Sequence, residues 1–251
     1  MTRAEYKSIL GAKPRIQKND DSLKKRNFHS QLKDIPESLD WREKGIVNGV
    51  RDQGNCGSCW AFSAVCAQEG QWARTKGELL SLSVQNLLDC DDDSEGCGGG
   101  WPFSGIFHVI SEQNGEWMLE NDYPYTSHSS NQCYFDASKG VSKTTKIVQL
   151  PINEEKILAA CAEYGVISCC IDSSPIDFMY YSEGIFDTDQ CNAWELDHAV
   201  NIVGYGAEAG TKYWIVRNSW GPKWGENGYI RMIRGTGICG IDMDSLYPVV
   251  E

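Results

Sequence analysis

A cysteine at the start of a predicted helix is the residue of this chain best suited to nucleophilic chemistry. Cys59 stands in the sequence Cys-Gly-Ser-Cys-Trp at residues 56–60, and helix-compatible residues follow it. The reactive form of a cysteine is the thiolate, which the positive end of a helix dipole favours. Gln53, six residues earlier, can donate its side-chain amide to an oxyanion that forms beside the sulfur. The plain alternative for Cys59 is a buried or disulfide-bonded cysteine.

His198 is the strongest candidate for the base that such a cysteine needs. It begins a β-branched run that predicts a buried strand. Asn218 can accept a hydrogen bond from one ring nitrogen and fix the tautomer, and Trp220 can shield that bond from water. The other three histidines have plainer explanations. His29 lies in a polar lead segment, His108 in a predicted helix and His128 in a Ser/Asn-rich loop. Without Cys59, a satisfied core histidine would be the better interpretation of His198.

These motifs make the chain resemble the papain-like cysteine proteases, on the cathepsin L-like side. The resemblance runs from Ile35 to Glu251 and includes a segment like a mature N-terminus (35–45) and a Gly-rich motif (96–100). It implies that Cys59 is the nucleophile and that His198 serves as base and later as acid. It also implies that Asn218 orients His198, and that Gln53 and the Cys59 N–H form an oxyanion hole.

The resemblance further implies a substrate-binding cleft. Gly99 and Gly100 would pair with the backbone of an extended peptide, although a Gly-rich stretch is more often a plain turn. The expected substrate-binding residues include Trp220 and the walls of a pocket for the second side chain before the scissile bond: Trp101, Pro102, Cys170, Leu196 and Ala199. Asp244 maps to the floor of this pocket. A carboxylate there can pair with a cationic side chain, so we hypothesise that Arg is accepted as well as Leu or Phe. The alternative is an Asp244 that faces solvent.

The elements that must position these residues follow from hydrophobic periodicity and capping signals. Helices are predicted from Cys59 to about Lys76, after Ser83, from Trp101 to about Glu112, and from Asn153 to Tyr164. Strands are predicted at 166–171, around His198, around Trp214 and at 228–232. Helices first and strands later indicate an α+β fold. By resemblance, the fold has two lobes around the cleft, a helical lobe mainly in 44–148 and a β-barrel-like lobe mainly in 149–246.

Eleven cysteines in 251 residues indicate an oxidising compartment. The resemblance implies three disulfides: Cys56–Cys97, Cys90–Cys133 and Cys191–Cys239. Four cysteines besides Cys59 then remain, and their state is open: Cys66, Cys161, Cys169 and Cys170. No apolar run is long enough for a membrane span. No signal peptide precedes the cysteine-rich part, so we expect a truncated N-terminus and a lysosomal or secreted protein.

Charge divides the chain into a basic leader (residues 1–34) and an acidic body (residues 35–251). The leader has nine Lys and Arg against four Asp and Glu, while the whole chain carries −12, so the body carries −17. An acidic body disfavours nucleic-acid binding. By resemblance the leader is a propeptide remnant, and the body a peptidase domain; a disordered tag or linker is the alternative for the leader. The basic leader should be attracted to the acidic body. Acid neutralises carboxylates but not Lys or Arg and so removes this attraction, and we therefore expect acid-triggered self-cleavage near Asp34–Ile35.

The resulting interpretation is a cysteine endopeptidase that forms an acyl-enzyme and is made as a precursor. Its expected partners are protein and peptide substrates, its own propeptide and inhibitors of the cystatin kind, and it should be a monomer. No cofactor is expected, and a single Cys-x-x-Cys pair does not complete a zinc site. The stretch 97–133 has no adjacent His pair of the kind that blocks the cleft of some exopeptidases. Two alternatives remain, a peptide ligase with the same catalytic residues and a protease-like binding protein without activity.

Overall fold

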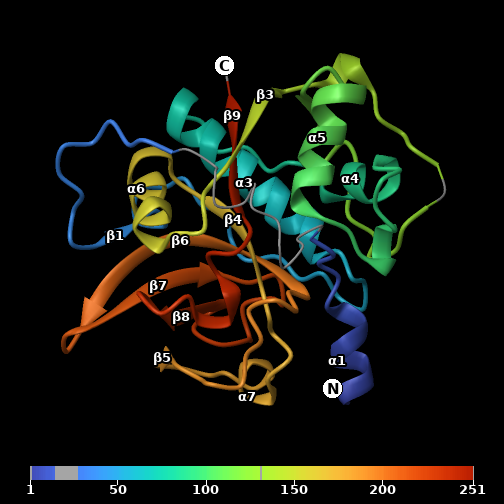
Figure 1. The fold of residues 1–251 in the computed structure, drawn as a ribbon. Helices are drawn as coiled ribbons and strands as arrows, with labels where there is room; N and C mark the ends of the chain where they lie inside the picture. The colour runs from blue at the N-terminus through green and yellow to red at the C-terminus, as the bar shows by residue number, and fades with distance from the viewer. Residues whose placement is uncertain (1, 15–27, 131, 251) are drawn as a thin grey trace.

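A long buried helix, α3 (Cys59–Lys76), lies at the centre of the computed structural model (Figure 1). The structure describes residues 2–14, 28–130 and 132–250. Apart from Trp72 and the last three residues, the side chains of α3 are buried. At Gly70 an added Cβ would come within 2.4 Å of the Val166 side chain, so the close packing here requires a glycine. The helix ends at Gly77, which adopts the left-handed conformation that favours glycine.

Shorter helices surround α3. Figure 1 shows α4 and α5 on one side of α3 and the strands β6 to β8 on the other. The helices and helical turns besides α3 are α1 (Arg3–Ile9), α4 (Val84–Cys90), η1 (Gly96–Gly98), α5 (Pro102–Glu112), η2 (Ala137–Lys139), α6 (Glu154–Tyr164), α7 (Ile176–Met179) and η3 (Ile238–Gly240). Among the described residues, no helix combines the length and the apolar character that crossing a membrane would require.

The strands form one sheet that joins the two parts of the molecule. They are β1 (Leu39–Asp40), β2 (Glu116–Trp117), β3 (Ser142–Gln149), β4 (Ile167–Ile171), β5 (Ile185–Phe186), β6 (His198–Glu208), β7 (Thr211–Arg217), β8 (Tyr229–Ile233) and β9 (Ser245–Val250). Their order is β2-β3-β9-β4-β6-β7-β8-β5, and β1 pairs with β6. All these pairings are antiparallel except that of β5 with β8. The order has two ends, so the strand-rich lobe is an open sheet within this α+β fold.

The predicted helices are present in the structure, and side-chain caps begin two of them. The Ser83 hydroxyl accepts a hydrogen bond from the Asn86 N–H at the start of α4. Asn153 caps α6 in the same way by accepting from the Lys156 N–H. The strands around His198 and Trp214 are β6 and β7. By contrast, β3 and β9 were not predicted, and they carry the sheet across to the helical side.

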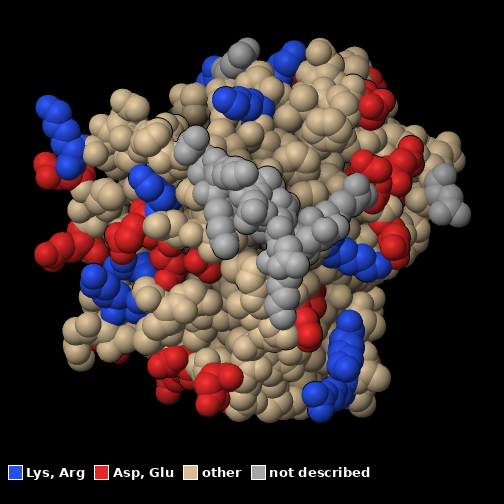
Figure 2. Space-filling model, viewed as in Figure 1, with Lys and Arg blue, Asp and Glu red and all other residues tan. Residues whose placement is uncertain are grey.

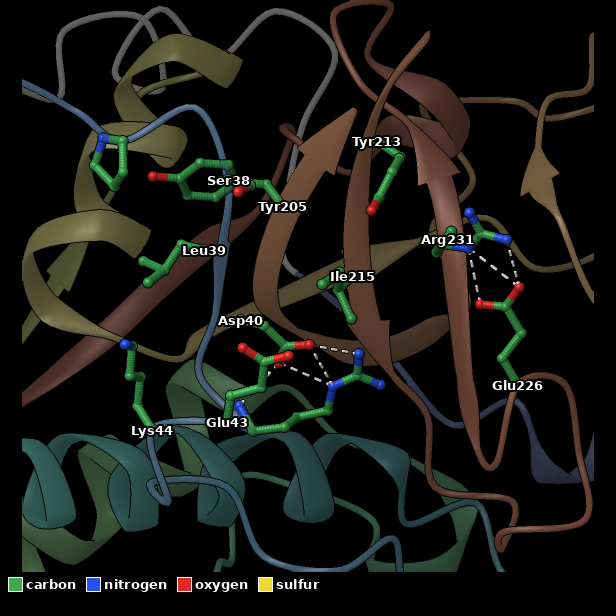
Figure 3. A pocket seen from close by; sticks show the side chains of 12 residues that line it. Ser38, Leu39, Asp40, Glu43, Lys44, Tyr205, Tyr213, Ile215, Glu226 and Arg231 are labelled. Carbon is green, nitrogen blue, oxygen red and sulfur yellow. Dashed lines mark hydrogen bonds and ion pairs between the residues drawn. The ribbon is translucent and has the colours of Figure 1, made fainter. Parts of the chain in front are cut away.

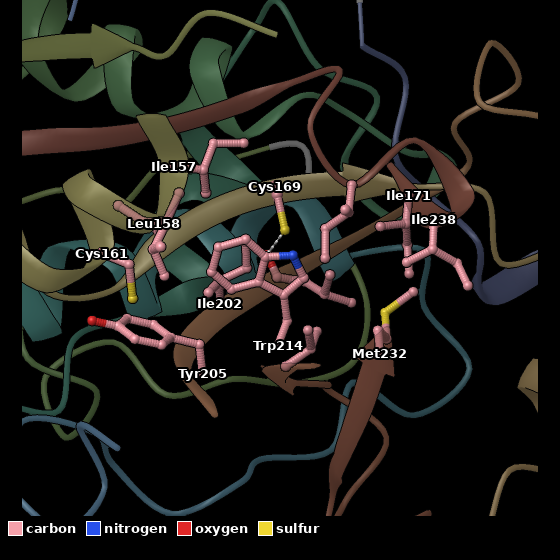
Figure 4. Packing of buried hydrophobic residues seen from close by; sticks show 14 of the residues in the cluster. Ile157, Leu158, Cys161, Cys169, Ile171, Ile202, Tyr205, Trp214, Met232 and Ile238 are labelled. Atoms are coloured by element: carbon pink, nitrogen blue, oxygen red, sulfur yellow. Dashed lines mark hydrogen bonds between the residues drawn. The ribbon is translucent and has the colours of Figure 1, made fainter. Parts of the chain in front are cut away.

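A core of large apolar residues fills the strand-rich lobe. Trp214 lies among Ile202 and Tyr205 of β6, Ile157 of α6 and Met232 of β8 (Figure 4). The indole N–H of Trp214 donates to Glu154 Oε1 at 2.7 Å, which satisfies the polar atom of the ring.

The cysteines divide into bridged and free groups. The structure contains the three bridges that the resemblance implied: Cys56–Cys97, Cys90–Cys133 and Cys191–Cys239. Five buried cysteines are free: Cys59, Cys66, Cys161, Cys169 and Cys170. Burial raises the pKa of the Cys161 thiol to about 12, so such cysteines act as small apolar side chains.

Candidate active site

Cys59 is the first residue of α3 and is completely buried in this structure. Burial raises the pKa of its thiol to about 11, and the backbone N–H groups of Ala199 and Gly11 only partly oppose this effect. Asp197 also acts on this thiol, and because Asp197 and Ala199 flank His198, the start of β6 lies beside the sulfur. Gly11 belongs to the leader, so the leader lies directly over the sulfur of Cys59. In this state the sulfur is held as a neutral thiol.

His198 begins β6 and is fixed by Asn218, which follows the end of β7. The His198 Nε2 lies 2.8 Å from the Asn218 Oδ1. An amide oxygen only accepts, so Nε2 carries the proton and donates a hydrogen bond to Asn218. Trp220 stacks on the imidazole, with ring centroids 4.7 Å apart. Among the described residues, the other ring nitrogen of His198 has no hydrogen-bond partner. Burial lowers the pKa of His198 to about 4, although the bond to Asn218 acts in the opposite direction.

Gln53 reaches the site from a loop that pairs with the segment after β7. The Gln53 N–H donates to the Ser219 carbonyl at 2.8 Å, and the Ser219 hydroxyl donates to Gln53 Oε1 at 2.6 Å. The second bond orients the amide so that its Nε2 donates to the carbonyls of Cys56 and Ile9, both at 2.8 Å. Ile9 lies in the leader. The Ile9 carbonyl therefore accepts a hydrogen bond from the Gln53 Nε2, the donor that the sequence analysis assigned to an oxyanion hole.

The leader crosses the site from α1 to Lys13. Tyr6 packs edge-on against Trp220 at a centroid distance of 5.6 Å and donates its hydroxyl to the Ser173 carbonyl. Ala12 forms a parallel bridge with Gly100, in which the Gly100 N–H donates to the Gly11 carbonyl at 2.8 Å. The Gly-rich loop therefore pairs with an extended backbone, here that of the chain's own leader.

The residues predicted to line a side-chain pocket lie together. Cys170 of β4 pairs with Ala199 of β6, and both belong to the apolar cluster that contains Cys59 and the leader residue Ala12. Partly buried members of the same cluster include Trp101 and Leu196. Pro102 is buried at the first position of α5, and Gly99 has a φ of 118° in the turn before it.

Asp244 is buried rather than exposed to solvent, which excludes the alternative that it faces water. Its Oδ2 accepts a hydrogen bond from the Trp101 indole N–H at 2.6 Å. It also lies beside Cys170, whose pKa burial raises well above the usual value with a further contribution from this carboxylate. The carboxylate thus contacts Trp101 and Cys170, two of the residues predicted to form the pocket walls.

The histidines that had plainer explanations lie outside the site, as expected. His108 of α5 contacts Gln113, and His128 contacts the Thr126 carbonyl in a loop. Groups of His, Cys, Asp and Glu that could hold a metal ion are absent from the described part of the chain.

A cavity of about 550 Å³ lies away from the candidate catalytic residues (Figure 3). Residues of β1, β6, β7 and β8 line it, among them Asp40, Tyr205, Tyr213 and Arg231. The Asp40–Arg42 and Glu226–Arg231 ion pairs lie at its walls. None of the predicted catalytic residues contributes to its lining.

Two features of the site escaped the sequence interpretation. Ser219 stood inside the Asn218/Trp220 motif, but nothing local indicates that its hydroxyl holds Gln53, 166 positions away. The contacts of Tyr6 and Ile9 were also missed, because α1 is only seven residues long and its apolar residues meet Met179 and Trp220 through the fold alone. The capping box at Thr2 and Glu5 was the signal that could have revealed α1.

Comparisons with known proteins agree with this geometry. The family model described as "Papain family cysteine protease" matches residues 35–249. Cathepsin L of Sarcophaga peregrina is 46% identical over 221 residues, which cover 86% of this chain and 64% of that relative. The chain thus spans a little under two thirds of that relative's own length.

Two solved structures resemble the fold over different parts of the chain. Digestive procathepsin L 3 of the Tenebrio molitor larval midgut matches with a TM-score of 0.87 and 36% identity, over 99% of this chain and 79% of that chain. Bromelain from Ananas comosus, in complex with the E64 inhibitor, matches with a TM-score of 0.79 and 39% identity, over 86% of this chain and 100% of that chain. The likeness to the procathepsin therefore extends over the leader as well as the body.

Proposed function

Because the chain belongs to the papain family of cysteine proteases, we propose that it is a cysteine endopeptidase made as a precursor. The observation that carries the proposal is the convergence of Cys59, the hydrogen-bonded His198–Asn218 pair and the Gln53 amide at one place. Each role that acyl transfer through a thiol requires has an occupant there. The bridge between the leader and Gly100 supports a cleft that binds extended peptides.

The reaction follows from these positions. His198 takes the proton of the Cys59 thiol through the ring nitrogen that faces away from Asn218, and the sulfur attacks the carbonyl carbon of the scissile peptide bond. The carbonyl oxygen becomes an oxyanion that accepts hydrogen bonds from Gln53 Nε2 and the Cys59 N–H. His198 then gives its proton to the leaving amine as the C–N bond breaks. Water, deprotonated by His198, attacks the thioester and releases the acid and the free thiol.

The leader acts in this proposal as a built-in block. Its Ile9 carbonyl accepts the hydrogen bond that an oxyanion would need, and Gly11 covers the Cys59 sulfur. Residues 1–34 thus serve as a propeptide, and residues 35–251 as the peptidase domain, with lobes mainly in 44–148 and 149–246. Residues 31–38 are all exposed, which suits self-cleavage near Asp34–Ile35 in acid.

Hydrolysis of fluorogenic peptides tests the proposal. The full chain and its Cys59→Ala variant are compared at acid pH with a reducing agent, with and without a thiol alkylator. We expect activity in the parent chain alone, abolished by alkylation. If the parent is silent, an added protease cuts the leader near Ile35 and the assay is repeated. Silence after that cut would contradict the endopeptidase function.

Asp244 supports a finer proposal about side-chain preference. Its carboxylate is buried at the end of apolar walls, where an entering guanidinium would find a counter-charge at low dielectric. We therefore propose that Arg is accepted at the second position before the scissile bond, beside Leu and Phe. The matched test is Asp244→Asn, which keeps an acceptor for the Trp101 indole while removing the charge. A positional peptide library should show a selective loss of Arg; an unchanged Arg/Leu ratio would refute the pocket assignment.

Localisation, inhibitor binding and oligomeric state are further parts of the proposal. Three disulfides support a lysosomal or secreted protein, because such bonds persist in oxidising compartments. A cleft that binds extended backbone also suits inhibitors of the cystatin kind. Size-exclusion chromatography with light scattering tests the proposed monomer, and a mass near 28.0 kDa is expected.

A further inference from the structure

The leader contacts the body at a second place, remote from the cleft. Phe28 is 6% exposed and packs into the core of the strand-rich lobe. Its ring meets Tyr164 and Tyr247 edge-on, with centroid distances of 6.0 and 6.5 Å. The two tyrosines stack on each other at 4.7 Å. Together they form an aromatic slot at the end of α6 and on β9, filled by one leader side chain.

A carboxylate beside the slot binds the residues that follow Phe28. The Ser30 hydroxyl donates to Glu163 Oε2 at 2.6 Å, and the Gln31 N–H donates to the same oxygen at 2.8 Å. Glu163 is only 9% exposed. A carboxylate at such a position needs hydrogen-bond donors, and here the leader provides them.

The position of the predicted cleavage site makes this contact consequential. Asp34–Ile35 lies in the exposed stretch between Gln31 and β1, so a cut there leaves Phe28, Ser30 and Gln31 on the leader. The cut leader would then hold the body at two places, the cleft and the aromatic slot. Two linked contacts retain a ligand far better than either alone, because release of one leaves the other in place.

We propose that Glu163, Tyr164 and Tyr247 form an exosite that recognises an aromatic side chain followed two and three residues later by hydrogen-bond donors. This exosite retains the cut leader on the enzyme, so that cleavage and loss of inhibition are separate steps. The inference rests on the proposed function only in treating residues 1–34 as a leader that is cut. The binding itself does not require catalysis.

A nicked, inactive chain tests the exosite. In the Cys59→Ala chain, exposed residues 32–35 are replaced by the recognition sequence of an added site-specific protease, and the purified chain is cut there. The N-terminus carries a fluorophore, so that dissociation of the leader is followed by size exclusion and by a chase with unlabelled chain. We expect the nicked parent to retain its leader at neutral pH.

Substitutions then separate the exosite from the cleft contact. Phe28→Ala should raise the leader's dissociation rate at least about tenfold, because a buried ring between two aromatic rings is lost. Glu163→Gln should raise it about threefold, since a charge-assisted acceptor becomes neutral. His29→Ala is the matched control, because His29 is exposed between Phe28 and Ser30, and it should leave the rate unchanged.

Two results would overturn the exosite. One is a nicked parent that loses its leader as fast as the Phe28→Ala chain, and the other is a Phe28→Ala chain that retains its leader like the parent. If Phe28→Ala fails to fold by circular dichroism, Ser30→Ala replaces it, because it removes only the hydroxyl that donates to Glu163. Since no chain in this experiment has Cys59, a negative result here is independent of whether the enzyme hydrolyses peptides.

Discussion

At the scale of single residues, one side-chain oxygen of Asn218 holds two groups of the site. It accepts from His198 Nε2 at 2.8 Å and from the Ser219 N–H at 2.8 Å. For Asn218→Ala we predict a fall in kcat of about 10- to 100-fold with little change in KM, because a buried imidazole loses its only described hydrogen-bond partner. Steady-state kinetics on the leader-free enzyme provide the measurement.

The conservative variant separates orientation from packing. Asn218→Asp keeps the acceptor and adds a charge, so it should retain more activity than Asn218→Ala. It should also move the alkaline limb of the pH–rate profile upward, since a neighbouring carboxylate favours the imidazolium. Equal losses in the two variants, with no shift of the profile, would contradict an orienting role for Asn218.

Ser219 is predicted to position the Gln53 amide. Its hydroxyl donates to Gln53 Oε1 at 2.6 Å and so directs Nε2 toward the site. Ser219→Ala should lower kcat about 2- to 10-fold, the effect of one neutral hydrogen bond, without a matching rise in KM. Ser111→Ala in α5, which removes an exposed hydroxyl, is the control. A change confined to KM would assign Ser219 to substrate binding instead.

The candidate catalytic residues could be chosen from sequence because each of them sits in its own short motif. Cys59, His198, Asn218 and Trp220 each follow or begin an element that local pattern predicts. Their partners were not readable where a contact joins distant segments, as between Ser219 and Gln53. A hydroxyl leaves no trace in periodicity, so only the fold shows which atom it serves.

At the scale of elements, hydrophobic periodicity predicted the longer helices, with or without a side-chain cap, whereas the short α1 was missed despite its capping box. Asn153 and Gly165 bracket α6, and both lie at its ends in the structure. The strands β3 and β9 lacked comparable signals. The sequence of β3, Ser-Lys-Thr-Thr-Lys-Ile-Val-Gln, mixes polar and apolar residues, and its partner lies about a hundred residues later. Such pairing depends on tertiary context rather than on local preference.

The leader strand at Gly11 fits the cleft only as glycine. A Cβ added to Gly11 would lie 1.9 Å from the Gly57 carbonyl oxygen, which no rotation of a side chain can relieve. Gly11→Ala should therefore loosen the leader, and the full chain should hydrolyse peptides faster before any cleavage. The initial rate of substrate hydrolysis, measured before processing and checked by gel, tests this prediction.

A glycine elsewhere supplies the control for this change. Gly49 has no atom within 4 Å of an added Cβ and no positive φ, so Gly49→Ala should leave the initial rate unchanged. If Gly11→Ala is as inactive before cleavage as the parent, the leader tolerates the displacement and the block does not depend on this close approach.

At the scale of the whole molecule, charge was expected to hold the basic leader on the acidic body. The described residues include one such contact, the ion pair of Lys13 with Glu95 at 2.6 Å. Five of the basic leader residues lie outside the described residues: Arg15, Lys18, Lys24, Lys25 and Arg26. Figure 2 shows acidic side chains at several places on one face of the body. The electrostatic part of the expectation therefore stays a prediction, whereas the described docking depends largely on apolar and backbone contacts.

Glu163 gives the second leader contact a predicted pH dependence. Burial alone would raise the pKa of this carboxyl, but the bonds from Ser30 and Gln31 outweigh it and hold the pKa below the usual 4.5. A lowered pKa means that the ionised form stabilises docking above about pH 4.5, and that this contribution is lost as the pH falls through the lower, docked value. The other ionisable groups near the carboxyl, Tyr164 and Tyr247, with Arg74 beside Tyr164, do not lose charge in that range.

Hydrogen exchange measures this effect in the Cys59→Ala chain. The protection factors of the Gln31 and Leu32 amides should stay constant from about pH 6 to about pH 4.5 and should fall between about pH 4.5 and about pH 2.5. In Glu163→Gln the protection should already be lower at about pH 6, and it should be nearly independent of pH. Protection in the parent chain that stays constant over this range would refute a role for the Glu163 charge.

The reactivity of Cys59 reports on the whole assembly of leader and body. With the leader in place, burial raises the pKa of Cys59 to about 11 and lowers that of His198 to about 4. At neutral pH only about one thiol in ten thousand would then be ionised, and the imidazole would be neutral as well. Removal of the leader hydrates the cleft, and a thiolate–imidazolium pair can form beside the helix end.

We predict that iodoacetamide modifies Cys59 at least about a hundredfold faster after leader removal, with an apparent thiol pKa several units lower. Rates measured from about pH 5 to about pH 10, with the modified residue located by mass spectrometry, provide the test. The buried Cys66 and Cys161 serve as internal controls and should stay unmodified in both forms. If the intact chain and the cut chain share one rate profile, the leader does not control ionisation of the nucleophile and inhibits by steric occlusion alone.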